Sequence, residues 1–393
     1  MELKPIDEIL AAGSRKADEV EVFFLEGSSV SATLKRKAVG NAAGSRSAGL
    51  SIRVISGGRI GISSTSNPAA WEKCLDAALA SARISTPQEW KGLPEQAAIA
   101  TGDLSFDPDV HPDAPVAREI LASMIEGSSA HPAEVTSGSA NIAEETEFLA
   151  NSHGVRYHSR STGVSASLEA ISGQSTGSEF GQSFRMDLDP RAIGEQAAFF
   201  ASHSKDGKEV RTGTYDVILS PSALSQLLGY VFMPAVSGRN VHAGRSRLAD
   251  ALGTPVMDEG LSLTDDPFSP RGLGSTYWDG EGIPTRRIEI VSDGMLMTFL
   301  YDLKTAYRYG KESTGSAVRG GYGGAPSIGH HNLILDGPRR NIRDERAIYV
   351  HDVVGAHTAN PMSGDFSVEC SNPIWVEGGE YQEPVRKAML SGN

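Results

Sequence analysis

Two acidic residues, Asp279 and Glu281, alternate with glycines in the segment Trp278-Asp279-Gly280-Glu281-Gly282-Ile283-Pro284-Thr285. Closely spaced carboxyl groups can serve catalysis or ligand binding when a fold holds them in one pocket. Asp and Gly are also ordinary turn residues, and an acidic turn is the more frequent explanation of such a pattern. Because glycine-rich turns expose backbone groups, we expect Asp279, Glu281 and Thr285 to line a cavity or an interface.

Two further segments have residue types suited to binding. The loop from Gly238 to Ser246 contains Arg239, Asn240 and His242, which could bind an anion or a carboxylate, although a simple connector is the commoner reading. The run Ser313-Thr314-Gly315-Ser316 is small and rich in hydroxyls, so its backbone can approach a ligand or another chain closely. We take Arg239, Asn240, His242, Ser313 and Thr314 as candidates for a cavity or an interface.

The ten histidines do not form a recognisable metal motif. No two of them stand one helical turn apart beside a Glu, which is the strongest sequence signal for hydrolytic zinc. His330 and His331 are adjacent, so on a strand they would face opposite sides. One alternative remains open, an autonomous enzyme with a composite site. Its residues would be His330, His351, His357 and Cys370.

A hairpin and a short helix should position the central candidates. Arg286–Val291 and Met295–Leu300 flank Ser292-Asp293-Gly294, and Asp-Gly is a strong hairpin signal. Residues 302–309 read as a helix that ends at Gly310. Upstream, Ser220-Pro221 opens a helix through Leu227 and Phe232 that is apolar almost all round, which predicts burial.

The chain of 393 residues is long enough for several domains, and its 43 glycines with many short alternating runs favour an α+β fold. We predict an N-terminal α+β unit (1–85), a Pro-containing connector (86–113) and a central α+β unit (114–208). Both units combine helices with antiparallel meanders. A β-rich C-terminal domain (209–393) follows. In the first two units we expect short strands, among them 20–25, 29–36, 134–142 and 145–150.

The net charge of −13 argues against nucleic-acid binding, which needs a basic face, but permits binding to a basic protein. Cys74 and Cys370 are far apart, which fits a reducing compartment rather than a disulfide framework. No run of 18 apolar residues is present, and the first twenty residues lack the pattern of a signal peptide. We therefore expect a cytoplasmic protein that binds neither nucleic acid nor membrane.

Several motifs together resemble the C-terminal domain of the TldD/PmbA family. They are Leu263-Thr264-Asp265-Asp266-Pro267, the Trp278–Thr285 segment, Asp293-Gly294, Ser313–Ala317, Ser363-Gly364-Asp365-Phe366-Ser367, Trp375–Glu380, Pro384-Val385 and Ser391-Gly392-Asn393. In that family the TldD-type subunit resembles a zinc metallopeptidase with H-E-x-x-x-H on the helix that opens this domain. Here that helix reads Leu227-Leu228-Gly229-Tyr230-Val231-Phe232-Met233-Pro234-Ala235 and contains no His, Glu, Asp or Cys.

The resemblance therefore implies a TldE/PmbA-type subunit that binds no metal and holds no assignable catalytic residue. It also implies a TldD-type partner that carries zinc, with a peptide or an unfolded protein as substrate. An alternative is a stand-alone homodimeric binding or regulatory protein without peptidase activity, as the family's association with modulators of DNA gyrase suggests. The acidic net charge speaks against direct DNA contact in that case.

Overall fold

The computed structural model describes residues 4–35 and 38–393. Its dominant element is a six-stranded antiparallel sheet with the order β3-β2-β1-β4-β5-β6. The strands are β1 (Glu19–Lys35), β2 (Ala38–Ser56), β3 (Arg59–Thr65), β4 (Glu134–Asn151), β5 (Arg156–Ser172) and β6 (Ser175–Ser183). Four of them have 17 to 19 residues, which corresponds to a length of roughly 55 Å.

The long strands correct the expectation of short ones. Breaks were predicted near Gly27 and near Ala143, but β1 and β4 run through both positions. Gly27 pairs with Ser47 on one side and with Glu145 on the other. Hydrogen bonding to two neighbouring strands therefore outweighs the local turn preference of Gly-Ser-Ser, because a central strand satisfies every backbone group in the ladder.

The same sheet joins both predicted α+β units, because β1 of the first unit pairs with β4 of the second. Helices α1 (Lys4–Gly13) and α2 (Trp71–Ile84) pack at one end, and α3 (Ala114–Ser128) and α4 (Pro190–His203) at the other. The short 3-10 turn η1 (Pro68–Ala70) leads into α2. The α+β fold is confirmed, whereas the division into the ranges 1–85, 86–113, 114–208 and 209–393 stays a prediction.

The predicted helix start at Ser220-Pro221 is confirmed by a side-chain cap, and Pro68 and Pro190 follow caps of the same kind. Asn67 accepts a hydrogen bond from the backbone of Ala69, and Asp189 accepts one from Ala192. Ser220 does the same for Ala223 at the start of α5 (Pro221–Leu227). In each case a polar side chain satisfies an amide that the first helical turn leaves free, and Pro follows where no amide is needed.

The C-terminal part is built from small sheets around its own apolar clusters. One has the order β10-β9-β8-β13, from β8 (Ser262–Asp265), β9 (Ile288–Ser292), β10 (Met295–Leu296) and β13 (Leu333–Asp336). A second is β18-β17-β14-β7, from β7 (Val217–Leu219), β14 (Ala347–Val350), β17 (Ile374–Glu377) and β18 (Glu380–Pro384). The others contain β11 (Ala317–Val318) with β12 (Ser327–Ile328), and β15 (Asp352–Val354), β16 (Phe366–Ser371) and β19 (Met389–Gly392).

The predicted hairpin and the helix after it are both present. Asp293 and Gly294 have φ values of 46° and 78°, as a tight two-residue turn requires, although the return strand β10 has only two residues. Helix α8 (Leu303–Arg308) begins after Asp302, whose carboxylate accepts a hydrogen bond from the backbone of Thr305. Gly310 follows this helix with φ 62°, as expected for a glycine C-cap.

The segment 86–113 carries no named helix or strand, as predicted for a connector. It nevertheless packs against both the sheet and the C-terminal part. Leu93 donates its backbone N–H to Glu19 of β1, and Gly92 accepts a hydrogen bond from the hydroxyl of Tyr307. Ser105 donates its hydroxyl to the backbone carbonyl of Ser275. The segment thus helps to fix the sheet on the C-terminal part.

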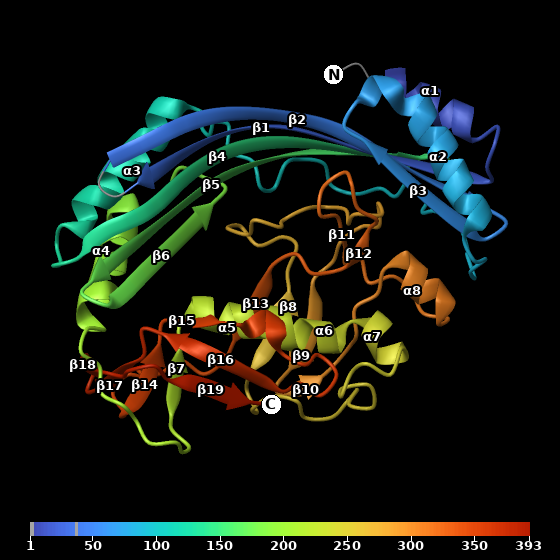
Figure 1. The fold of residues 1–393 in the computed structure, drawn as a ribbon. Helices are drawn as coiled ribbons and strands as arrows, with labels where there is room; N and C mark the ends of the chain where they lie inside the picture. Colours follow the sequence, from blue (N-terminus) through green and yellow to red (C-terminus); the bar gives the residue numbers. More distant parts are fainter. Residues whose placement is uncertain (1–3, 36–37) are drawn as a thin grey trace.

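Figure 1 shows the sheet as an arch above the C-terminal part. Below the arch lie α5, α6 (Met233–Val236) and α7 (Gly238–His242). The π-helical turn η2 (Leu228–Phe232) joins α5 to α6 along the chain, and the 3-10 turn η3 (Ala356–Thr358) follows β15. Within the described residues, no helix is both long and apolar enough to cross a membrane. The underside of the arch and the helices below it therefore face each other.

Candidate functional site

Asp279 organises the acidic turn. Its carboxylate is buried and accepts hydrogen bonds from the backbone N–H groups of Glu281, Ile283 and Ala317, at 2.9, 3.0 and 3.0 Å. Burial raises the pKa of Asp279, and these three N–H donors oppose that shift. The Asp side chain thus fixes the loop between Trp278 and Pro284, which form an isolated bridge, and attaches it to β11.

Glu281 connects this turn to the sheet and to α8. One oxygen accepts a hydrogen bond from the Arg53 guanidinium at 2.6 Å, and the other accepts one from the backbone N–H of Leu303 at 2.7 Å. The side chain is 1% exposed. Burial raises the pKa of Glu281, Arg53 lowers it, and the nearby carboxyls of Asp279 and Asp302 raise it.

Arg53 and Arg319 complete a buried network of charges between the sheet and the C-terminal part. Arg53 lies on β2 and forms ion pairs at 2.6 Å with both Glu21 and Glu281. Arg319 reaches the second oxygen of Glu21 at 2.5 Å and donates its Nε–H to the carbonyl of Gly280 at 2.6 Å. All four charged side chains are at most 5% exposed, so the network is shielded from solvent and salt.

The charge balance of this network is uneven. Two guanidinium groups, from Arg53 and Arg319, face three carboxyl groups, from Glu21, Glu281 and Asp279. Burial is the main reason why the pKa values of Asp279 and Glu281 both rise, and the neighbouring Asp279 adds to the rise at Glu281.

The hydroxyl candidates are hydrogen-bonded within the chain. Thr285 donates its hydroxyl to the carbonyl of Thr276 at 2.6 Å. Thr314 accepts a hydrogen bond from the backbone N–H of Tyr301 at 2.9 Å, and its hydroxyl lies 2.9 Å from that of Ser316. Ser313 makes a longer hydrogen bond, 3.3 Å, with the carbonyl of Tyr301. Thr285 and Thr314 are buried, so these groups hold the loops around the acidic turn together.

The three candidates of the 238–246 loop lie on or beside α7. Asn240 donates its amide to the carbonyl of Pro234, and Arg239 is exposed. The His242 ring stacks on Tyr309 at 4.1 Å, and its Nε2 lies 3.1 Å from the hydroxyl of Tyr301. Burial and the nearby Lys311 lower the pKa of His242. Tyr301 also bonds Thr314, so it links this loop to the hydroxyl-rich segment.

The eight predicted residues thus differ in burial and do not form one constellation. Four are buried, namely Asp279, Glu281, Thr285 and Thr314. Arg239 and His242 are exposed, and Asn240 and Ser313 are partly buried. Their role as cavity or interface residues stays a prediction.

The helical segment below the arch is less buried than its sequence predicts. Residues 227–232 are all partly or fully exposed, and Tyr230 is 51% exposed. The expectation of a buried helix is therefore wrong. Only Met233, Ala235 and Val236 further along enter the core. The pattern was correctly read as apolar, but an apolar surface can also face a hollow or a partner.

The four residues of the alternative composite site do not converge. His351 stacks on Phe200 at 3.8 Å and its Nε2 lies 3.0 Å from the carbonyl of Ser178. Cys370 belongs to the apolar cluster around β16, and His357 lies in η3 near Tyr230. Across residues 4–35 and 38–393, no three His, Cys, Asp or Glu side chains are placed to hold one metal ion. The helix 227–235 likewise offers no donor atom that suits zinc.

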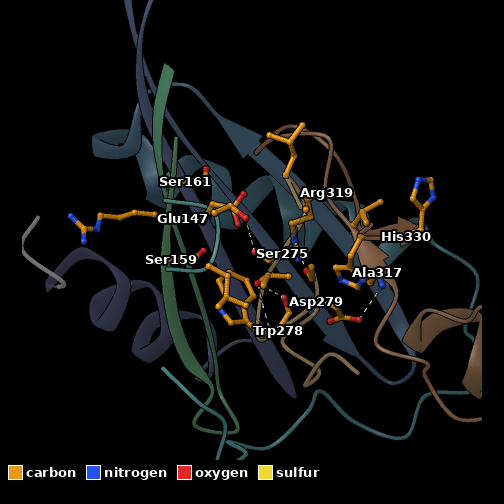
Figure 2. A pocket seen from close by; sticks show the side chains of 18 of the residues that line it. Glu147, Ser159, Ser161, Ser275, Trp278, Asp279, Ala317, Arg319 and His330 are labelled. Atoms are coloured by element: carbon orange, nitrogen blue, oxygen red, sulfur yellow. Dashed lines mark hydrogen bonds between the residues drawn. The ribbon is translucent and has the colours of Figure 1, made fainter. Parts of the chain in front are cut away.

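A cavity of about 200 Å³ lies between the underside of the sheet and the acidic turn. Glu147 of β4 and Ser159 and Ser161 of β5 line the sheet side, as Figure 2 shows, and Ser275, Asp279, Arg319 and His330 line the opposite side. His331 also lines it. The expectation that His330 and His331 face opposite sides fails because they lie between β12 and β13 rather than on a strand.

Sequence reasoning missed the residues that the sheet supplies, namely Glu21, Arg53 and Glu147. Arg53 is a charged residue inside the apolar run Leu50–Ile55, and this was the available signal, because a charge inside such a strand needs a partner. His331 was also missed as a partner of Asp265. Its Nδ1 lies 3.1 Å from Asp265, which also accepts two backbone N–H groups.

Comparison with known proteins identifies the class to which this fold belongs. The chain superposes on TldE from Thermococcus kodakarensis with a TM-score of 0.89, at 24% identity, covering 99% of this chain and 91% of that one. It also superposes on a "putative modulator of a DNA gyrase" from Thermotoga maritima with a TM-score of 0.87, at 26% identity and with the same coverage. The fold is therefore that of TldE-like proteins.

The sequence matches three family models along the chain. They are PmbA/TldA metallopeptidase domain 1 over residues 20–82, the central domain over 107–205 and the C-terminal domain over 212–393. The chain thus belongs to the PmbA/TldD family, as its motifs indicate. An uncharacterized protein of Methanocaldococcus jannaschii is 30% identical over 99% of this chain and 92% of its own length. A metalloprotease PmbA homolog of Haemophilus influenzae is 28% identical over 98% of this chain and 86% of its own.

Proposed function

We propose that this chain is the TldE/PmbA-type subunit of a two-subunit metallopeptidase complex, in which a TldD-type partner supplies the zinc ion. The observation that carries the proposal is the helical segment 227–235 below the arch. It is partly exposed and apolar and contains no residue that could bind zinc or act as a general base. Such a segment suits a chamber wall or a subunit contact better than a catalytic centre.

The role of this subunit would be to complete the chamber and to hold a peptide or an unfolded segment by strand addition. Strand β6 is the last strand of the large sheet, and an edge strand can pair with an added chain. The carbonyls of Thr176 and Ser178 already accept from Asn372 and His351, so the pairing would use the second half of β6, around Phe180. A hollow of about 550 Å³ lies beside β6 and is closed on its other side by Pro221, Ser222 and Ser225 of α5. Phe180 of β6 is 56% exposed and is available for contact with a bound chain.

Metal content and peptide hydrolysis, measured on one sample, test the catalytic part of the proposal. We expect the isolated chain to retain no stoichiometric zinc and to hydrolyse no peptide. After mixing with a TldD-type homologue from the same genome, we expect a complex in size-exclusion chromatography and zinc-dependent hydrolysis. Stoichiometric zinc together with activity in the isolated chain would contradict the proposal and would point to a composite site elsewhere.

Strand addition has its own test. The Phe180→Asp variant should weaken the binding of an unfolded peptide to the complex, whereas Met186→Asp, an exposed residue just beyond the end of β6, should not. Fluorescence anisotropy of a labelled peptide measures both. Equal affinities of the two variants would argue against β6 as the binding edge.

A second candidate is a homodimeric regulatory protein without peptidase activity. It is favoured by 26% identity over almost the whole chain to the Thermotoga maritima protein described as a gyrase modulator. The net charge of −13 makes a protein target more plausible than DNA in that case. A stable homodimer that neither associates with a TldD-type homologue nor gains activity from it would support this function over the first.

A further inference from the structure

The cavity below β4 and β5 contains a carboxyl group without a partner. Glu147 lines the cavity and is half-buried, and within the described chain its carboxyl group makes neither a hydrogen bond nor an ion pair. A half-buried carboxyl group that has no partner within the chain and lines a cavity is available to a ligand. Glu147 takes no part in the ion network that joins the sheet to the C-terminal part.

The two guanidinium groups of the cavity are paired with other residues, and neither forms an ion pair with Glu147. Arg319 is committed to Glu21 and to the carbonyl of Gly280. Arg160 forms an ion pair with Asp103 at 2.9 Å. Each positive group in the lining thus has a partner already, and the charge that remains available to a ligand is negative.

Neutral acceptors lie beside Glu147. Ser159 is its direct cross-strand neighbour, and Ser161 is two residues further along the same face of β5. Neither serine hydroxyl makes a hydrogen bond with another described residue, and Figure 2 shows both beside Glu147. One carboxylate and two hydroxyls on one face form a set of three acceptor groups.

A buried imidazole provides a second, independent indication of a ligand. The His331 side chain is 4% exposed, lines the same cavity, and has no hydrogen-bond partner for its Nε2 atom in the described part of the chain. Its Nδ1 lies 3.1 Å from Asp265 and donates to that carboxylate, so Nε2 is an acceptor when the ring is neutral. The lining therefore has more free acceptors than donors.

We propose that this cavity binds a primary ammonium group, whose three N–H donors match the carboxylate of Glu147 and the hydroxyls of Ser159 and Ser161. A metal ion fits less well, because no three ligating side chains converge in the described residues. An anion would meet the unpaired carboxylate. The ammonium group can come from the N-terminus of a peptide or from a free small amine, and the proposal does not rest on the peptidase complex.

The ionisation of Glu147 provides a pH signature. Burial raises the pKa of Glu147 to about 7, Glu145 raises it further and Arg319 lowers it. The other titratable or charged groups of the lining are Arg160, Asp279, His330 and His331. Because only the carboxylate attracts a cation, affinity for an amine that stays protonated should rise about tenfold between pH 6 and pH 8.

Isothermal titration of the full chain with three probes tests the proposal. The probes are glycylglycine, its N-acetylated form and 1,4-diaminobutane. We expect saturable binding of at least one free amine with a dissociation constant of about 1 mM or lower, and none of the acetylated dipeptide. Tighter binding of glycylglycine would indicate a peptide N-terminus as the natural ligand, and tighter binding of the diamine a free amine.

Variants locate the binding at the cavity. Glu147→Gln should weaken binding at pH 8 by roughly tenfold or more, and Ser159→Ala by a smaller factor, because a charged hydrogen bond is the stronger one. Glu134→Gln, the same change at the exposed start of β4, is the matched control. Absence of binding to any amine, an unchanged affinity in Glu147→Gln, or equal binding of the acetylated dipeptide would each overturn the proposal.

Discussion

One face of the large sheet presents Val20, Val22 and Ile52 to helices α1 and α2, and the opposite face presents Glu21, Arg53 and Glu147 to the C-terminal part. Neighbouring residues of one strand therefore meet opposite environments. The apolar face is stabilised by contacts that many side chains could make, whereas the charged face depends on particular pairs. The helix layer needs only the right pattern, but the contact with the C-terminal part needs the right residues.

The largest effect is expected from removing the central cation. Arg53→Leu leaves Glu281 buried without its partner and should lower the free energy of unfolding by about 3–5 kcal/mol. Urea denaturation measures this, and Arg46→Leu, at an exposed position of the same strand, is the control. Similar midpoints for the two variants would show that the ion network does not stabilise the fold.

The apolar face should tolerate a conservative change better than the charged face. Ile52 is fully buried, so Ile52→Ala should cost about 2–5 kcal/mol, but Ile52→Val only about 0.5–1.5 kcal/mol. Arg53→Lys keeps the charge but loses the planar fork that reaches two carboxylates, so it should cost more than Ile52→Val. The reverse order in urea denaturation would remove the distinction between the two faces.

Glu147 should give the charged face a pH dependence that the apolar face lacks. The pKa of Glu147 is 4.5 in the unfolded chain and is raised to about 7 in the folded state. The folded state therefore gains stability from the protonated carboxyl group at low pH and loses it as the pH rises from about 4.5 to 7. Glu147→Gln should therefore gain stability relative to the wild type between pH 5 and pH 8, on the order of 2 kcal/mol.

The control for this pH dependence is Glu134→Gln on the same strand, which should show a difference that does not change with pH. A relative loss of stability in Glu147→Gln as pH rises would have the wrong sign and would mean that Glu147 has a partner in solution.

A smaller effect is expected at the acidic turn. Asp279→Asn keeps the size of the side chain but replaces one carboxylate oxygen by an NH2 group. That group cannot accept a hydrogen bond from the backbone N–H groups that bond Asp279. The expected loss is about 1–3 kcal/mol in urea denaturation. Asp293→Asn, in the exposed hairpin turn at positive φ, should be nearly neutral because Asn suits that conformation.

The smallest effect is expected for a charge pair that lies in solvent. Arg191 on α4 and Glu126 on α3 are 61% and 66% exposed. Arg191→Ala should change the free energy of unfolding by less than about 1 kcal/mol, because solvent weakens the attraction. A loss comparable to that of Arg53→Leu would mean that exposure does not govern the strength of ion pairs in this protein.

Local signals predicted much of the secondary structure. The capped start of α5, the helix before Gly310 and the Asp293-Gly294 turn were recognised from the sequence, because each depends on a few adjacent residues. The lengths of β1 and β4 were not, because pairing with distant strands decides whether a strand continues through Gly27. The exposure of Tyr230 was also missed, since an apolar pattern does not specify what lies opposite it.

In the candidate site, too, local sequence signals identified some residues, and only the structure identified their partners. The sequence drew attention to Asp279 and Glu281, and both proved to be at the contact between the sheet and the C-terminal part. Arg53 and Glu21 could not be assigned to them, because 228 residues separate Arg53 from Glu281 along the chain. The roles of Arg239, Asn240, His242 and Ser313 depend on a binding partner, and they stay predictions.

The sequence by itself determined the family, the α+β class and the absence of zinc ligands from the helix 227–235, because motifs and residue types are local properties. Only the tertiary structure decided that two predicted units share one sheet, that Glu281 pairs with Arg53, and that Glu147, Ser159 and Ser161 surround one cavity. These are contacts between residues far apart in sequence, which form only when the whole chain buries its apolar surface.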